Sequence, residues 1–399
     1  VGDMNLTFDA GYIQNDIAKI GNQVWLESKD GRDNVYDALN PDDQPLENVE
    51  VILWNAATNT PVDTAYTDAT GNYLFCVTAG MYQLQFVAPD GTVEWKFDYS
   101  SPERETHHDA ELLPNGNVIA MVWEKHSAEE AVEAGFVFED EVYVESIIEV
   151  NPTTQEIVWE WKSWDHLIQQ NDDTKSNYGS ISEHPERIDI NYVPISEGSA
   201  NTKGDIMHAN GIAYDAVNDV ILLSVNFYSE VWAIDHSTST EEAASRSGGN
   251  YNKGGDLIYR FGNPGAYQNT LGTRLFHNNH FPNILKGEDQ GKLLIFSNGN
   301  DKEQSTVFEM NLPQEYSLKA NTNNELKISW SFTDSNLYAS RVSGAVALPN
   351  GNIMITEGDY GIWEVTQEGE VVWKFSADGF FWRAYHYDKD APEILALGL

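Results

Sequence analysis

The sequence is poor in cysteine and in basic residues. Cys76 is its single cysteine, so an intramolecular disulfide is excluded, and its apolar neighbours predict a small buried side chain. The 23 lysines and arginines stand against 63 aspartates and glutamates, which leaves a formal net charge of −40 over 399 residues. Such a chain has no basic surface with which to neutralise phosphates, and a nucleic-acid partner is therefore excluded.

Long apolar runs are lacking too. No uninterrupted apolar stretch reaches the roughly 18 residues that a membrane-spanning helix needs, so we expect no membrane span. The chain begins at Val1 without an initiator methionine, and we expect the start of a processed, mature protein. Acidic residues are spread along the whole chain, which is typical of a solvated, self-repelling surface. We therefore expect a secreted protein, either extracellular or periplasmic.

Helical periodicity is almost absent. The one helix we expect covers residues 128–134, with Gly135 as its stop signal. Short alternating runs, such as 117–123 and 292–296, lie instead between Asn-Gly, Asp-Gly and Glu-Gly turns. Aromatic residues, which favour strands, make up 12% of the chain. These signals predict an all-β fold.

One pattern recurs along the chain: a turn, then a short strand with an aromatic residue at its centre and usually another at its end. The five copies cover residues 93–97, 157–161, 257–261, 328–332 and 371–375. Repetition of one unit predicts a β-propeller, in which each four-stranded blade covers the apolar face of its neighbour. We expect the aromatic strands to be the outer strands of successive blades. The uneven spacing predicts loops inserted in several blades.

The two ends of the chain allow separate predictions. Residues 1–90 either supply the first blade or form a small β-sandwich that resembles the prealbumin-like repeats of bacterial surface proteins; residues 91–399 would form the propeller. Counting blades favours the first alternative slightly, because the remaining chain has about four and a half blades and an incomplete ring leaves bare edges. Residues 380–386 should close the ring by pairing near the N-terminal strands.

Histidines mark the start of three repeat units. They are His107 with His108, His208, and His277 with His280. The first strand of each blade lines the central channel of a propeller, so these side chains should converge at one mouth of the axis. The plainer alternative is that each histidine bonds a neighbouring strand or loop. Clustered histidines can act as nucleophile, acid, base or metal ligand.

Several linked segments resemble the arylsulfotransferase family, in order, over about residues 90–390. They are 107–117, 159–166, 208–215, 221–235, 276–277 and 343–352. The resemblance implies a six-bladed propeller that moves a sulfuryl group from a phenolic sulfate ester to another phenol, without a nucleotide sulfate donor. Its partners would be small phenols and aryl sulfates, and a histidine would carry the sulfuryl group transiently. No cofactor is implied.

The resemblance also implies roles for individual residues. His277 stands where the family has its nucleophile, with His208 and His108 at the supporting positions, and His107 and His280 beside them. A neutral imidazole can attack sulfur, and protonated imidazoles can stabilise the sulfate oxygens.

The sequence departs from the family at its arginine, where this chain has Asn226. A neutral amide donates hydrogen bonds but supplies no charge. Arg341, at the start of another first strand, is the substitute that the sequence offers, and Asn210 is a further candidate for substrate binding.

Other motifs carry less information. Asp30, Asp33 and Asp37 lie in a segment that resembles a calcium loop, although Lys29 and Arg32 interrupt its acidic spacing. Two further functions stay open: a non-catalytic extracellular propeller that serves as a surface adhesin or structural subunit, and a metal-dependent hydrolase that uses the same histidines. The oligomeric state and any surface assembly stay open too.

Overall fold

The computed structural model describes residues 97–193, 204–358, 361–376 and 381–386, together with the backbone of seven N-terminal strands. Contacts divide the chain into two compact units: Val1–Ser100 with Tyr385–Leu399, and Ser101–Ala384. Within the described part of the chain, no helix is long and apolar enough to cross a membrane.

The described strands of the first unit pair in the antiparallel sense. β1 (Ala18–Gln23) pairs with β6 (Asn72–Val77), and β2 (Trp25–Leu26) pairs with β3 (Gln44–Pro45). β4 (Glu50–Asn55) lies between β5 (Thr60–Tyr66) and β7 (Tyr82–Phe86). The boundary at residue 90 and the choice between a blade and a β-sandwich stay predictions. The side chain of Cys76 and the calcium-loop residues Asp30, Asp33 and Asp37 lie outside the described residues.

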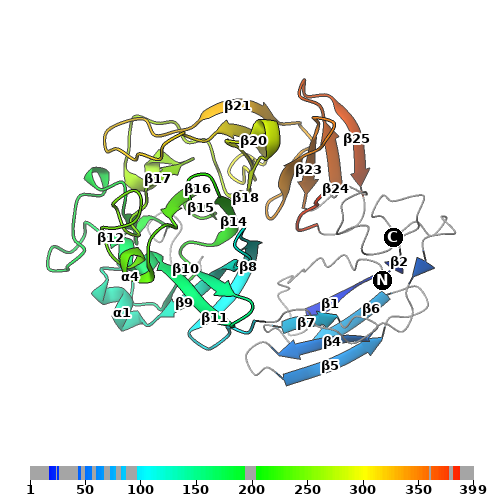
Figure 1. The fold of residues 1–399 in the computed structure, drawn as a ribbon, viewed down its shortest axis with the longest axis horizontal. Coiled ribbons are helices and arrows are strands. Elements are labelled where there is room, and N and C mark those ends of the chain that lie inside the picture. Colours follow the sequence, from blue (N-terminus) through cyan, green and yellow to red (C-terminus); the bar gives the residue numbers. More distant parts are fainter. Residues whose placement is uncertain are drawn as a thin grey trace. The chain divides into compact units, whose positions relative to one another are not determined.

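Among its described residues, the second unit has four successive four-stranded antiparallel sheets (Figure 1). The first has β8 (Arg104–Leu112), β9 (Val118–His126), β10 (Val142–Asn151) and β11 (Glu156–Lys162), and the second has β14 (Ala209–Asp215), β15 (Val220–Val225), β16 (Glu230–Asp235) and β17 (Tyr259–Phe261). The third has β18 (Asn279–Ile284), β19 (Lys292–Ser297), β20 (Thr306–Asn311) and β21 (Lys327–Phe332), and the fourth has β22 (Gly344–Ala347), β23 (Ile353–Glu357), β24 (Gly361–Val365) and β25 (Val371–Ser376). Strands in each sheet follow chain order from one edge to the other, as in propeller blades.

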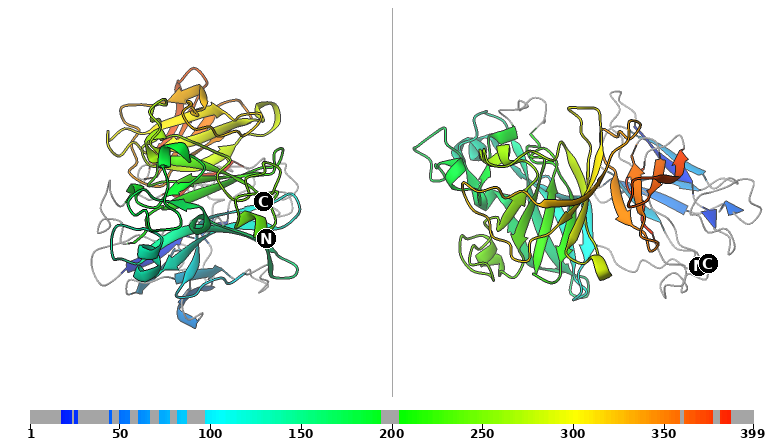
Figure 2. Two further views of the ribbon diagram at one scale, coloured as in Figure 1. Left: turned by 90° about the vertical axis from the view of Figure 1, so that its left-hand side faces the viewer. Right: turned by 90° about the horizontal axis from the view of Figure 1, so that it is seen from above.

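The first strands of these sheets are neighbours: β8 contacts β14, β14 contacts β18, and β18 contacts β22. The two further views show the sheets following one another in chain order (Figure 2). Four of the five aromatic strands predicted to be outer strands are β11, β17, β21 and β25, the last strand of each sheet, and this prediction is confirmed. The fifth, at 93–97, lies mostly outside the described residues. The closed ring and the count of six blades stay predictions.

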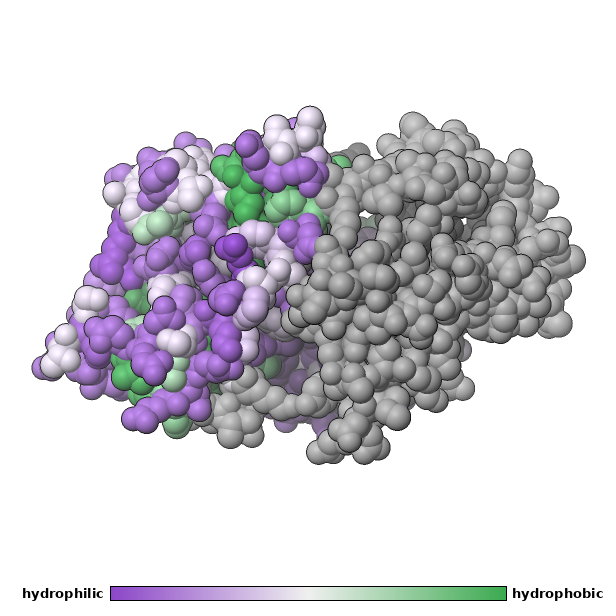
Figure 3. Space-filling view, turned by 90° about the horizontal axis from the view of Figure 1, so that it is seen from below, coloured by the Kyte–Doolittle hydropathy of each residue, from purple (hydrophilic) through white to green (hydrophobic). Residues whose placement is uncertain are grey.

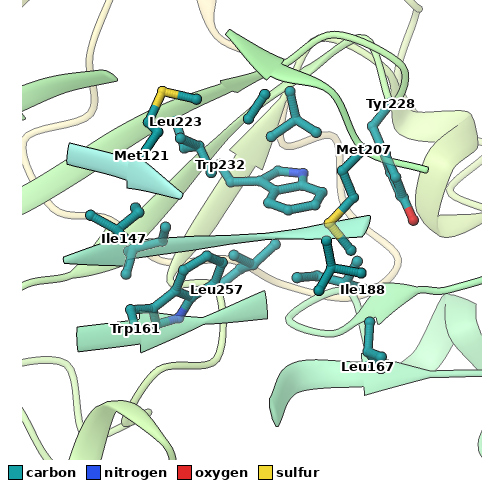
Figure 4. Close-up of a cluster of buried hydrophobic side chains, with 14 of the residues drawn as sticks. Met121, Ile147, Trp161, Leu167, Ile188, Met207, Leu223, Tyr228, Trp232 and Leu257 are labelled. Atoms are coloured by element: carbon teal, nitrogen blue, oxygen red, sulfur yellow. The ribbon is translucent and has the colours of Figure 1, made fainter. Parts of the chain in front are cut away.

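Apolar side chains fill the space between consecutive sheets. Between the first and second sheets, Met121, Ile147 and Trp161 pack with Leu223 and Trp232 (Figure 4). Two further clusters lie between the second and third sheets and between the third and fourth. Because each sheet buries one face against the next, the inner edges of the sheets are held at fixed positions, and the loops at those edges can carry a rigid site.

Short elements connect these sheets. α1 (Ala128–Glu133) confirms the predicted helix: Ser127 and Glu130 cap its first turn reciprocally, and Gly135 follows it with a positive φ of 80°. The insertion after β11 holds the short parallel pair β12 (Leu167–Ile168) and β13 (Ile188–Asp189), and α4 (Thr240–Ala243) follows β16. On the face drawn in Figure 3, hydrophilic residues surround small hydrophobic patches, as expected for an acidic surface.

Candidate active site

Bulged backbone at the first strands presents two of the histidines. The register of β8 against β9 shifts between Thr106 and Ala110, and His108 within this bulge has a φ of 54°. His208, immediately before β14, has a φ of 51°. Positive φ costs a residue with a side chain about 1 kcal/mol or more, so two histidines held in this conformation indicate a site whose surroundings impose it.

His107 and His108 form the end of a hydrogen-bonded chain. The Nε2 atom of His107 lies 2.9 Å from Oε2 of the buried Glu145, and its Nδ1 atom lies 2.7 Å from Nδ1 of His108. Glu145 also accepts a 2.8 Å hydrogen bond from the backbone N–H of Ala209, which fixes its carboxylate against β14. The ring of His107 stacks on Trp123 at 4.2 Å between centroids. His107 is therefore held rigidly between a carboxylate and the second imidazole.

The rings of His108 and His208 are in contact, with centroids 4.9 Å apart and planes nearly perpendicular. Burial, the neighbouring histidines and Arg383 hold the pKa of His108 well below its usual range, so its ring is neutral. Burial alone would lower the pKa of His208 as well, but the hydrogen bond from its Nδ1 to Asp205, at 2.5 Å, and the charge of that carboxylate raise it. The two imidazoles in contact therefore have opposite tendencies to bind a proton.

Residues near the end of the second unit reach the same histidines. The ring of Trp382 lies 5.3 Å from that of His108. Nη1 of Arg383 lies 2.7 Å from Oδ2 of Asp109, and its Nη2 donates a 2.8 Å hydrogen bond to the carbonyl oxygen of Asn210. The guanidinium of Arg383 lies over the ring of Phe281, 4.3 Å from its centroid. Through these contacts, residues 382–383 touch residues of β8, β14 and β18. Closure of the ring by pairing of residues 380–386 near the N-terminal strands stays a prediction.

His280 interacts electrostatically with this group, but both of its ring nitrogens are occupied. Nδ1 lies 2.6 Å from Oδ1 of Asn298, and Nε2 accepts a 3.1 Å hydrogen bond from the backbone N–H of Val342. Burial, His208 and Arg383 lower the pKa of His280 to about 3. His280 is therefore a neutral ring that fixes the loop before β22.

His277 has a different set of neighbours. Its Nδ1 lies 2.9 Å from Oδ2 of Asp301, and its Nε2 lies 3.4 Å from Nζ of Lys302. Burial, together with the charges of Arg274 and Lys302, lowers its pKa. Within the described residues, His277 makes no hydrogen bond or ring contact with His108 or His208. The structure thus groups His107, His108, His208 and His280, and it gives His277 an environment of its own.

Comparison with known proteins assigns the chain to a family. Residues 51–376 match the family described as Arylsulfotransferase (ASST). The chain belongs to the arylsulfotransferase family. This confirms the resemblance seen in the histidine-bearing segments.

Other similarities are local or distant. A segment of 74 residues is 36% identical to Colossin-B of Dictyostelium discoideum, and it spans 18% of this chain but only 2% of Colossin-B. A putative 6-phosphogluconolactonase from Bacteroides fragilis is 11% identical, with a TM-score of 0.35 over 80% of this chain and 69% of that one. BamB from Moraxella catarrhalis is 9% identical, with a TM-score of 0.29 over 82% and 71% of the two chains. The periplasmic gluconolactonase PpgL of Pseudomonas aeruginosa is 9% identical, with a TM-score of 0.28 over 84% and 97%.

Asn226, at the arginine position of arylsulfotransferases, is buried and bonded to the backbone of the next sheet. Its Nδ2 donates to the carbonyl oxygen of Asn279 at 3.2 Å, and its Oδ1 accepts from Nδ2 of Asn278 at 2.9 Å. Asn210 donates to the same carbonyl at 2.8 Å. Arg341 is exposed. Asn226 and Asn210 thus bond the second sheet to β18 of the third. The guanidinium that lies beside the histidines is that of Arg383.

Sequence reasoning missed Glu145, Asp205, Trp382 and Arg383. Two of them left a weak signal: Glu145 interrupts an apolar run in β10, and Asp205 precedes His208 by three residues. Residues 382–383 gave none beyond their aromatic surroundings. Among the described residues, no group of three His, Cys, Asp or Glu side chains is arranged to hold a metal ion.

Proposed function

We propose that this arylsulfotransferase transfers a sulfuryl group from an aryl sulfate ester to a phenol through a sulfated histidine, and that His108 is the nucleophile. The observation that carries the proposal is the contact between His108, whose pKa is lowered, and His208, whose pKa is raised. A nucleophile must be neutral and a general acid must be protonated at the same pH, and this pair meets both conditions.

The hydrogen-bonded chain from Glu145 supports the choice of nucleophile. A carboxylate only accepts, so Nε2–H of His107 donates to Glu145. In the tautomer with its proton on Nε2, His107 accepts at Nδ1 from Nδ1–H of His108, and the lone pair of His108 lies on Nε2. Among the described residues, that Nε2 makes no hydrogen bond. His108 can therefore attack sulfur while Glu145 and His107 stabilise the positive charge that develops on its ring.

The proposed reaction has two steps. In the first, the Nε2 lone pair of His108 forms a bond to sulfur, the bond from sulfur to the phenolic oxygen breaks, and that oxygen takes the Nε2 proton of His208. In the second, His208 removes the proton of the acceptor phenol, whose oxygen attacks sulfur, and the bond from nitrogen to sulfur returns its electrons to His108. Asp205 holds Nδ1 of His208 throughout, so that Nε2 carries the proton that moves.

The experiment that tests this proposal compares single alanine variants in turnover of para-nitrophenyl sulfate with a phenol acceptor. His108→Ala should abolish turnover, and His277→Ala, at the family's nucleophile position, should retain most of it. His184, which is half exposed and bonded to Glu186, provides a matched control that should retain full activity. With donor alone, mass spectrometry of the natural protein should find one added SO₃ group on the peptide that contains His108.

Other outcomes would redirect the proposal. Loss of turnover in His277→Ala, with the SO₃ group on its peptide, would return the nucleophile to His277. Absence of turnover and of any sulfated peptide in the natural protein would favour a non-catalytic propeller. A secreted location, extracellular or periplasmic, belongs to the proposal as well, and the acidic composition supports it.

A further inference from the structure

Residues 381–384 are bonded to the fourth sheet of the second unit. The backbone N–H of Phe381 donates to the carbonyl oxygen of Gly358 at 2.8 Å, and that of Ala384 donates to Oγ1 of Thr356 at 2.9 Å. Between them, the carbonyl oxygen of Trp382 accepts from the N–H of Ser343 at 3.3 Å. The backbone at Trp382 and Arg383 is therefore fixed at the start of β22 and the end of β23, and both side chains have defined positions.

Arg383 supplies the permanent positive charge of the histidine group. Its side chain is 5% exposed, and its charge acts on both His108 and His280. The other groups whose charges lower the pKa of His108 are histidines, which lose their charge as the pH rises. Asp109 and the carbonyl oxygen of Asn210 orient the guanidinium from two different strands. A fixed, planar cation of this kind suits a tetrahedral oxyanion.

Trp382 adds an aromatic surface beside the same nucleophile. Its indole is tilted by 42° to the ring of His108 at 5.3 Å, and Trp123 is nearly perpendicular to that ring at 5.8 Å between centroids. Trp382 is partly exposed, so a flat ligand can reach it. Aromatic pairs are favourable in offset or tilted arrangements at such separations, which makes the indole a platform for a phenyl ring.

We propose that Trp382 and Arg383 form the recognition element for the donor: Arg383 binds the sulfate oxygens and Trp382 binds the aromatic ring. The proposal deepens the proposed function and rests on it for the position of the reacting sulfur. It identifies the two residues of this chain that would distinguish a flat aryl sulfate from a saturated alkyl sulfate. It also assigns to a segment beyond the last sheet the charge that Asn226 does not supply.

Direct binding to the full chain tests the two roles separately. Calorimetry with inorganic sulfate, para-nitrophenyl sulfate and cyclohexyl sulfate would compare the natural protein with Arg383→Ala, Arg383→Lys, Trp382→Ala and Trp382→Phe. Both Arg383 variants should weaken all three anions, the alanine by about tenfold or more and the lysine by less. Trp382→Ala should weaken only the aryl sulfate, by several fold, and Trp382→Phe should restore most of that affinity. The natural protein should prefer para-nitrophenyl sulfate to cyclohexyl sulfate.

Two surface residues provide matched controls. Arg246 and Trp373 are exposed, and alanine at either position should leave all three affinities unchanged. In turnover, Arg383→Lys should raise KM for the donor more than it lowers kcat, whereas a merely structural role would lower the folded fraction without changing KM. Added guanidinium ion should partly restore sulfate binding to Arg383→Ala.

Each remaining outcome decides between the two proposals. Unchanged sulfate affinity in either Arg383 variant, or no binding of any of the three anions to the natural protein, would overturn this inference. Binding that depends on Arg383 and Trp382, without turnover, would leave it standing and would reject the proposed reaction. Turnover that depends on His108, with unchanged anion binding in the Arg383 and Trp382 variants, would support the proposed reaction and would overturn this inference.

Discussion

Nε2 of His236 lies 3.0 Å from a carboxylate oxygen of Glu149, and this contact joins the second sheet to the first. Nδ1 of the same imidazole lies 2.7 Å from Oδ1 of Asp219, so the ring is held between two carboxylates. Glu149 also accepts hydrogen bonds from Asn115 and Asn117 in the turn before β9. Although burial opposes both charged forms, these partners raise the pKa of His236 and lower that of Glu149 to about 2.

The His236–Glu149 contact predicts how stability depends on pH. A histidine whose pKa is raised by folding stabilises the protein fully below the unfolded value of about 6.5, and this contribution is lost as the pH rises through the folded value. The contribution of Glu149 is present above its ordinary pKa and is lost as the pH falls toward 2. Urea unfolding across this range should show both losses. His236→Asn should reduce the loss on the alkaline side and lower the free energy of unfolding by about 2 kcal/mol near pH 6; an unchanged alkaline slope would contradict this.

The pair of His108 and His208 predicts a pH profile for turnover. Activity should decline as the pH rises through the raised pKa of His208, because the acid is then deprotonated, and should persist well into the acidic range, because His108 protonates only there. Asp205→Asn removes the carboxylate that raises the pKa of His208. The alkaline limb of kcat/KM should then move to lower pH. If the alkaline limb of kcat/KM does not move, a group other than His208 determines it.

Asn226→Arg tests the position at which the family has its arginine. Asn226 is buried, and its amide bonds to Asn278 and Asn279, so a guanidinium there would be a buried charge and would break both contacts. We expect a loss of about 2 kcal/mol or more in the free energy of unfolding and no gain in turnover. Thermal melts and assays with para-nitrophenyl sulfate would measure both. A clear rise in turnover would instead indicate that a residue at position 226 binds the sulfate group.

Two tryptophans in the last strands of their sheets should differ in their effect on stability. Trp161 of β11 is 1% exposed and its Nε1–H donates to the carbonyl oxygen of Gly255 at 2.8 Å, whereas Trp373 of β25 is 47% exposed. Trp161→Ala should cost about 3–5 kcal/mol in the free energy of unfolding, because it opens a cavity and leaves a carbonyl unpaired. Trp373→Ala should cost less than about 1 kcal/mol. Similar losses in denaturant titrations would show that β25 is covered in solution.

Much of this arrangement could be predicted because its signals are local. Turns of the Asn-Gly type and aromatic residues at strand centres identify outer strands without any knowledge of their partners, and histidines that precede a strand can be assigned to the edge where that strand begins. The choice between His277 and His280 could not be predicted. Asn278 and Phe281 both have positive φ, and β18 shifts register between His280 and Asn283, so the local backbone decides which ring faces the group.

The position of Arg383 beside the histidines was beyond sequence reasoning for a different reason. Its hydrogen bond to Asn210 joins residues 173 positions apart, and no periodic pattern links them. The sequence drew attention to Asn226 by its missing charge, and it could not show that this amide donates to a buried backbone carbonyl. Contacts of this kind depend on which edges the fold brings together.

The separation between Arg383 and its partners also bears on synthesis. His108 and His208 leave the ribosome long before residues 381–384, and contacts between distant residues form late because closing long loops is slow. Throughout translation the nascent chain thus carries its histidines without the guanidinium and indole that stand beside them. On the proposed mechanism, the growing polypeptide cannot hold a sulfate ester productively, and activity begins only when the final segment of the second unit has emerged and docked.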